Sequence, residues 1–202
     1  MKKKKIFIVV AACLLLLTVS AGGTLAYLTY RTAEVKNTLT VGDILQPDDS
    51  FDLIEHEATD SDRDGIYTLT STETTENTYV VLPGVDLPKD PFVRTGKVLA
   101  LDAYVFVEVV DETSDALTVI VDDSWTLVDV TGSHGGDVYT IGICQAGTTA
   151  LSKTILKNNE ILVADATIAD PGTVSFYGYM IQAAGFANAK EAAVDGLGFT
   201  EN

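Results

Sequence analysis

The chain has few of the residues that stabilise small exported proteins through covalent cross-links. Cys13 and Cys144 are the only cysteines among 202 residues. Cys13 lies in an N-terminal apolar segment that we expect to be removed, so the mature protein would keep only Cys144 and could form no disulfide within the chain. Its stability must come from an apolar core, and the remaining length is sufficient to bury one in a single domain.

Motifs of the common enzyme classes are also missing. The sequence contains no His-Glu-x-x-His helix, no Gly-x-Ser-x-Gly elbow, no phosphate-binding loop and no dinucleotide fingerprint. The two histidines, His56 and His134, could join carboxylates in a catalytic zinc site, but such residues more often occupy a solvated strand and a loop tip. Cys144 ends an apolar stretch and is interpreted as a small buried residue. We therefore expect no catalytic residues and no enzyme activity.

Basic residues are scarce, with 13 Lys and Arg against 29 Asp and Glu. Four of the 13 are Lys2 to Lys5, and the first 26 residues hold no acidic residue, so their removal leaves a net charge of −20. This charge repels phosphate backbones and anionic lipids, which argues against nucleic-acid and membrane-surface binding. Cations and basic partners remain compatible with it.

The N-terminus has the layout of a signal peptide. The four lysines precede an apolar run of about 14 residues, 6–19, which as a helix is about 21 Å long and shorter than the ~30 Å bilayer core. Small residues follow, and we place the cleavage between Ala26 and Tyr27. In a rival interpretation Cys13 is acylated as in a lipoprotein, but the apolar run continues after it. We expect a secreted or cell-surface protein that meets the membrane only during export.

The rest of the chain has the period of β-strands, with apolar residues that alternate with polar ones between turn residues. Such a pattern favours an antiparallel β-sandwich with one short C-terminal helix. We divide the chain into a signal peptide at 1–26, an extended segment or first strand at 27–41 and the sandwich domain at 42–202. The predicted strands are 38–44, 51–57, 66–71, 78–82, 103–110, 117–121, 125–130, 138–144, 161–166 and 173–182.

Two strands and one helix are the clearest elements. The stretch 103–110 alternates aliphatic and larger side chains and predicts a central strand, and Gly178 in 173–182 predicts a bulge. Asn188 can cap a helix over 189–195 that ends at Gly196. The proline-rich stretch 81–91 predicts a connecting loop, because proline lacks the N–H that a sheet interior needs.

Asp60, Asp62 and Asp64, followed by Gly65, match the first half of a calcium loop. Calcium needs six to eight oxygen ligands, and the twelfth position of this loop is Ser71 where a bidentate glutamate is expected. A helix–loop–helix site is therefore not predicted. The alternative is an acidic hairpin turn, since Asp and Gly are common turn residues. Calcium is the only cofactor that the sequence suggests.

Several short motifs resemble the TasA/camelysin family. They are Gly23-Thr24-Leu25-Ala26-Tyr27-Leu28-Thr29, Asn37-Thr38-Leu39-Thr40-Val41-Gly42, Leu82-Pro83-Gly84, Lys89-Asp90-Pro91, Ala103-Tyr104-Val105-Phe106-Val107 and Tyr179-Met180-Ile181-Gln182-Ala183-Ala184-Gly185-Phe186. Family members usually carry Phe-Thr-Asp after the cleavage site, where this chain has Leu28-Thr29-Tyr30.

The resemblance implies a jelly-roll-like β-sandwich and a precursor cut by the endoplasmic-reticulum-type signal peptidase of Gram-positive bacteria. It also implies a secreted subunit of biofilm matrix fibres or of the cell surface. Some camelysin-like members are described as metalloproteases, but no residues here match a protease site.

The segment freed by cleavage could drive assembly. Its apolar residues are Tyr27, Leu28, Val35, Leu39 and Val41. Such a segment can add as a strand to the open edge of a neighbouring molecule, where main-chain hydrogen bonds give affinity. It could equally complete its own sheet as a first strand. We therefore carry three hypotheses: a structural matrix subunit, a calcium-dependent adhesion module, and a metal-dependent protease.

Overall fold

A computed structural model describes residues 29–31, 50–147 and 149–202 of the chain. The predicted signal peptide, its cleavage site at Ala26 and Tyr27 and the predicted strand 38–44 lie outside the described residues. So do four residues of the proposed assembly segment, Leu28, Val35, Leu39 and Val41.

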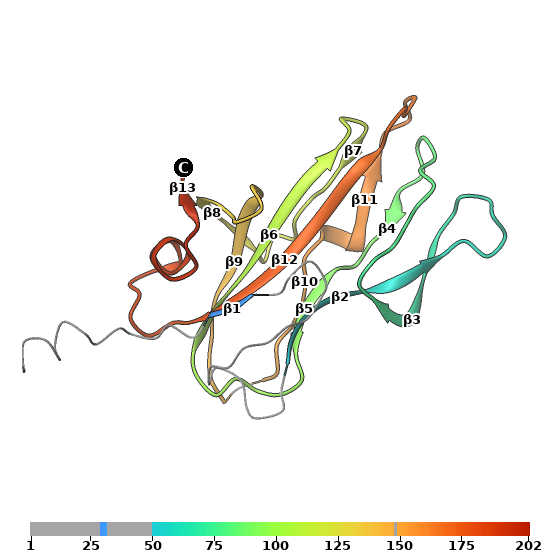
Figure 1. Ribbon diagram of the computed structural model, residues 1–202. Helices are drawn as coiled ribbons and strands as arrows, with labels where there is room; N and C mark the ends of the chain where they lie inside the picture. The colour runs from blue at the N-terminus through green and yellow to red at the C-terminus, as the bar shows by residue number, and fades with distance from the viewer. Residues whose placement is uncertain (1–28, 32–49, 148) are drawn as a thin grey trace, which may run out of the picture.

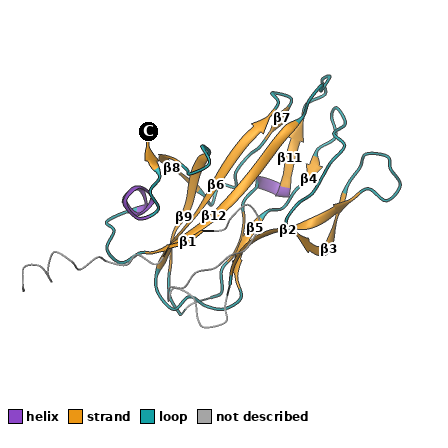
Figure 2. Ribbon diagram, in the orientation of Figure 1, coloured by secondary structure: helices purple, strands orange, loops and turns teal. Residues whose placement is uncertain are grey.

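The described part is an all-β protein built from antiparallel strands, as the sequence predicts (Figure 2). The strands are β1 (Thr29–Arg31), β2 (Phe51–Thr59), β3 (Thr68–Thr74), β4 (Leu87–Pro88), β5 (Phe92–Thr95), β6 (Ala103–Thr113), β7 (Leu117–Thr118), β8 (Thr126–Thr131), β9 (Asp137–Cys144), β10 (Ser152–Thr154), β11 (Glu160–Val163), β12 (Gly172–Gln182) and β13 (Thr200–Glu201).

They form three sheets. The largest has the order β1-β12-β6-β9-β8-β13, and its long central strands β6 and β12 run side by side through the molecule (Figure 1). The smaller sheets have the orders β10-β5-β2-β3 and β4-β11-β7. The first seven residues of β6 are all buried, which confirms the predicted central strand and shows that both of its faces are covered.

The first core lies between one face of the large sheet and the two smaller sheets. The large sheet contributes the aliphatic face of β6 together with Phe176 and Met180 of β12. Phe51, Leu53 and Val93 come from the four-stranded sheet, and the three-stranded sheet adds further aliphatic residues. Trp125 packs here and donates from Nε1 to the Thr154 carbonyl at 2.7 Å, so its polar atom is satisfied.

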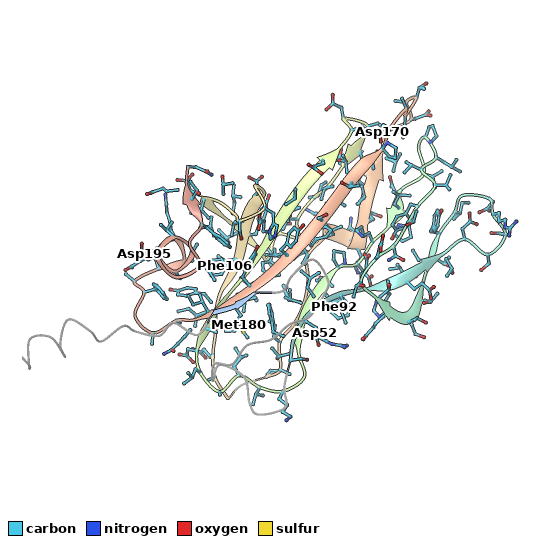
Figure 3. All side chains as sticks on the ribbon, viewed as in Figure 1. Asp52, Phe92, Phe106, Asp170, Met180 and Asp195 are labelled. Carbon is cyan, nitrogen blue, oxygen red and sulfur yellow. The ribbon has the colours of Figure 1, made fainter. Side chains whose placement is uncertain are left out.

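The opposite face of the large sheet is covered by the C-terminal helical turns, α2 (Ala189–Glu191) and η2 (Ala192–Gly196). Asn188 accepts from the Glu191 N–H at 2.9 Å, which confirms the predicted cap. A further short turn, η1 (Lys157–Asn159), precedes β11. In Figure 3, Asp195 of the helical turn and Asp170 before β12 lie far apart on the molecule. Among the described residues, no helix is both long and apolar enough to cross a membrane.

Some predicted boundaries are wrong. The predicted strand 78–82 is absent, and this segment instead makes side-chain contacts: the Val80 N–H donates to the Tyr67 hydroxyl, and the Tyr79 hydroxyl donates to the Pro88 carbonyl. The predicted loop 81–91 contains β4, where Pro88 sits on the outermost strand of its sheet and removes no interior hydrogen bond.

The predicted bulge is also misplaced. β12 pairs with β6 in unbroken register through Gly178, and the irregularity falls between Val105 and Phe106 of β6, opposite β9. Gly142 of β9 has φ +80° at this point, a left-handed conformation that glycine adopts at little cost. Strands β5, β10 and β13 were not predicted.

Candidate functional site

On the outer side of β12, β1 is the only strand among the described residues. β1 pairs only with residues 179–181 of β12, with Thr29 opposite Ile181 and Arg31 opposite Tyr179. On the same side, no described strand pairs with residues 172–176. We call this stretch the open edge. In Figure 1, β1 lies against one end of β12, and the rest of the long strand continues beyond it.

A groove of about 1020 Å³ runs along the open edge and reaches both faces of β12. Its inner wall, on the side of the first core, includes Leu53, Tyr79 and Phe176. Its outer wall, on the side of the second core, includes Tyr177 and His134. A strand edge with which no described strand pairs, lying beside a groove, has the features that an added strand requires.

A buried ion pair lies in the inner wall. The Lys89 ammonium is 2.7 Å from Glu55 Oε2, and both side chains are at least 90 % buried. The ammonium also lies 5.9 Å from the ring centroids of Tyr79 and Phe176. Burial, followed by the nearby carboxylates of Glu55 and Asp90, raises the pKa of Tyr79, so this phenol stays protonated.

The residues next to this ion pair make a second link between β2 and the 77–90 segment. Asp90 accepts from the His56 N–H at 2.9 Å and lies 2.6 Å from His56 Nδ1. Asn77 accepts from the Ala58 N–H and donates to the His56 carbonyl, both at 2.8 Å, next to the irregularity in the β2–β3 pairing. Together with the ion pair, these contacts fix the 77–90 segment to β2 and so hold the inner wall in place.

Glu108 supports the outer wall from beneath. Its side chain is fully buried, and its carboxylate accepts from the Tyr179 hydroxyl at 2.7 Å and from the N–H groups of His134 and Gly136 at 2.7 and 3.0 Å. His134 Nδ1 lies 3.0 Å from Glu108 Oε2. Among the described residues, His134 is the only basic side chain paired with Glu108. The carboxylate thus holds the 132–136 hairpin tip against the sheet.

Two further observations show how closely this hairpin fits. Burial alone would raise the pKa of Glu108, but the hydrogen bonds from Tyr179, Gly136 and His134 outweigh it and lower the pKa below its ordinary value of 4.5. A Cβ on Gly132 would overlap the Glu108 carboxylate, so glycine is needed there for close approach.

The His134 imidazole stacks on Tyr177, with ring centroids 3.7 Å apart and an interplanar angle of 5°. Its side chain is 42 % exposed. The prediction of a loop tip is confirmed for His134, but the prediction missed that a buried carboxylate fixes the imidazole. Local spacing gives no signal for this contact, because Glu108 is 26 residues away and Tyr179 is 45 residues away.

Metal-ligating residues gather at one place in the described part of the chain. The oxygens of Asp60, Asp62 and Asp64 lie within 4.8 Å of one another, so the predicted convergence of these carboxylates is present. Asp60 also accepts from the N–H groups of Asp64 and Gly65, at 3.1 and 3.0 Å, which is the bonding of an acidic turn.

Neither histidine belongs to a group of three ligands within the described residues, so the geometry of a two-histidine zinc site is not found there. Cys144 is half-buried against the first core, and burial raises the pKa of its thiol. A thiol with a raised pKa is a poor nucleophile, which agrees with a packing role.

No family model, curated protein or solved structure matches this chain.

Proposed function

We propose that the chain is exported, loses residues 1–26 and serves as a structural, non-enzymatic subunit of an extracellular matrix fibre or cell-surface layer. The signal peptidase of the endoplasmic-reticulum type acts on the precursor, and the mature domain is a jelly-roll-like β-sandwich. Support for the sandwich comes from the first core, which lies between the large sheet and the two smaller ones.

The open edge of β12 carries the proposal. Residues 172–176 have no described strand on one side and line a groove, while the next residues of the same edge already accept β1. An edge that binds one strand offers the same hydrogen-bonding geometry to its continuation. Subunits therefore assemble when the segment 27–41 of one molecule leaves its own β12, where β1 pairs with residues 179–181, and adds to β12 of the next. The leader keeps Tyr27 at the membrane until cleavage, which couples assembly to export.

Charge opposes this assembly. A subunit with a net charge of −20 repels its neighbours, and ions screen that repulsion within about 10 Å at 0.1 M salt. Raised salt or divalent cations should therefore promote fibre formation.

Electron microscopy of the secreted protein, with its N-terminal residue determined in parallel, tests the proposal. Fibres built from a chain that begins at Tyr27 are expected. A matched chain that begins after Val41 should stay monomeric under the same conditions. Met1 or Lys2 on the secreted protein, a lipid on Cys13, or fibres from the shortened chain would each count against the proposal.

The convergent carboxylates of Asp60, Asp62 and Asp64 favour a second candidate, a calcium-dependent adhesion module. Calcium bound only by the folded state would raise the melting temperature at millimolar concentration. Asp62→Asn tests the site, because no turn hydrogen bond is seen for the Asp62 side chain, and Asp115→Asn is an exposed acidic control. A melting temperature that calcium leaves unchanged would remove this candidate.

A further inference from the structure

Lys89 and Glu55 meet where little of either side chain reaches solvent. Their side chains are 10 % and 7 % exposed, and Nζ lies 2.7 Å from Oε2. Lys157 and Lys190 also contact carboxylates, at 2.8–3.0 Å, but every side chain in those pairs is at least 35 % exposed. The distance between amine and carboxylate is therefore ordinary, and burial is what distinguishes the Lys89–Glu55 pair.

The backbone holds both residues in this position. Glu55 lies in β2 and pairs with Thr74 of β3. The Lys89 N–H, just after β4, donates to the Asn159 carbonyl at 2.8 Å. Reacting groups that a fold holds in contact reach effective concentrations of about 10⁵–10⁸ M when they are well oriented. The amine and the carboxyl group thus meet without the entropic cost of an encounter between two molecules.

The surroundings leave the pair with little competition. Phe176 beside the ammonium has no polar side-chain atom, and the Tyr79 hydroxyl is engaged as a donor to the Pro88 carbonyl at 2.7 Å. Two buried charges carry a desolvation cost that a neutral amide does not. A site that excludes water also slows the hydrolysis that would reverse amide formation.

We propose that the Lys89 amine and the Glu55 carboxyl group condense into an isopeptide bond within the folded chain. The ammonium gives one proton to Oε2, and the neutral amine then attacks Cδ. A C–N bond forms, the bond from Cδ to the hydroxyl breaks, and the hydroxyl leaves with a second proton from nitrogen as water. One ammonium and one carboxylate thus give one amide and one water, with no other reactant. Both residues line the groove, which gives the water a route out.

The bond joins β2 to the 77–90 segment through residues that are 34 apart in the chain. A cross-link between distant residues stabilises a fold by restricting the unfolded chain. Cys144 is the only cysteine outside the predicted signal peptide, so the isopeptide bond takes the place of an internal disulfide. It forms within one subunit and does not depend on fibre assembly. The ion pair is the reactant, and stability measured before the bond forms reports the ion pair alone.

Mass spectrometry of the intact protein tests this bond. The freshly purified chain is incubated at neutral pH, and a species lighter by about 18 Da, the mass of one water, should accumulate. Fragment spectra of its proteolytic peptides should place the link between Glu55 and Lys89. The melting temperature of the converted protein should be higher by about 10 °C.

Two lysine variants serve as matched controls. Lys89→Arg keeps the positive charge but has no amine to form this bond, and it should retain the full mass. Lys157→Arg changes an exposed lysine and should convert as the unsubstituted chain does. If Lys89→Arg does not fold, the fragment spectra of the unsubstituted chain still decide the question.

Three outcomes would overturn the proposal. The first is an unsubstituted chain that keeps its full mass, and the second is a loss of water that persists in Lys89→Arg. The third is a set of fragment spectra that place the loss elsewhere, such as a succinimide at Asp64-Gly65. None of these outcomes bears on strand addition, which the microscopy tests separately.

Discussion

Glu55 and Glu108 are both buried beside the groove, but different groups compensate their charges. Glu55 meets the ammonium of Lys89 at 2.7 Å in the inner wall. Glu108, in the outer wall, meets backbone N–H groups, a tyrosine hydroxyl and an imidazole that is itself 42 % exposed. Removing one partner of an ion pair leaves a whole charge uncompensated, whereas removing one of several donors leaves the others in place. Compensation of the Glu55 charge should therefore depend on one contact, and compensation of the Glu108 charge on several.

The largest effect is expected from Lys89→Met. The substitution keeps the volume but leaves the Glu55 carboxylate buried without its cation, which should cost about 3–5 kcal/mol of unfolding free energy. Chemical denaturation measures it. The matched double variant Glu55→Leu with Lys89→Met removes both charges and should recover most of the loss. A single variant as stable as the parent would show that water reaches the ion pair.

Glu108→Gln should cost somewhat less, about 2–3 kcal/mol. The amide keeps the shape of the side chain but loses the negative charge that strengthens each hydrogen bond. Tyr179→Phe removes a single donor and should cost about half as much by the same measurement. If Tyr179→Phe lowers the unfolding free energy as much as Glu108→Gln does, the other donors to the Glu108 carboxylate contribute nothing to stability, contrary to this prediction.

The pH dependence of stability should show the Glu108 contribution separately. A carboxylate whose pKa is lowered in the folded state stabilises the protein above its ordinary pKa of 4.5, and this stabilisation is lost as the pH falls through the folded pKa. The unfolding free energy of the parent chain should therefore drop further on acidification below about pH 4 than that of Glu108→Gln. Parallel pH profiles for the two proteins would contradict the assignment.

Gly132→Ala tests how closely the hairpin approaches the carboxylate. The added methyl group overlaps the Glu108 side chain, so the hairpin must shift, at a cost of about 1–3 kcal/mol. Ser133→Ala is the neighbouring control, since the Ser133 hydroxyl lies 3.1 Å from the Tyr179 hydroxyl and makes no hydrogen bond with the carboxylate. A Gly132→Ala variant with parental stability and an unchanged His134–Tyr177 contact by NMR would refute the close fit.

The smallest effect is expected from Lys157→Ala, which removes an ion pair to Asp123 on the exposed surface. Such pairs contribute about 0–1 kcal/mol because water and salt screen them. A loss comparable to that of Lys89→Met would mean that burial does not distinguish the two pairs.

The sequence predicted the elements that are determined by residues close together in the chain. The alternation in 103–110 gives β6, and Asn188 followed by Glu191 gives the helix start. The acidic turn at 60–64 converges as its spacing suggests. In each case the residues that fix the structure lie within a few positions of one another.

Contacts between distant residues could not be predicted. Glu55 and Lys89 are 34 residues apart, and Glu108 and Tyr179 are 71 apart, so no periodicity connects them. Strand β3 begins at Thr68, two residues later than predicted, because the Ile66 N–H donates to the Asp64 carboxylate and remains in the turn. Strand β10 has only three residues and is held by its pairing with β5.

Hydrogen–deuterium exchange at the amides of residues 172–176, measured in the monomer and in the assembled state, tests strand addition most directly. Amides of the open edge that exchange readily in the monomer should become protected on assembly, while those of β6 stay protected in both states. Exchange at residues 172–176 that is the same in fibres as in monomers would contradict assembly through β12.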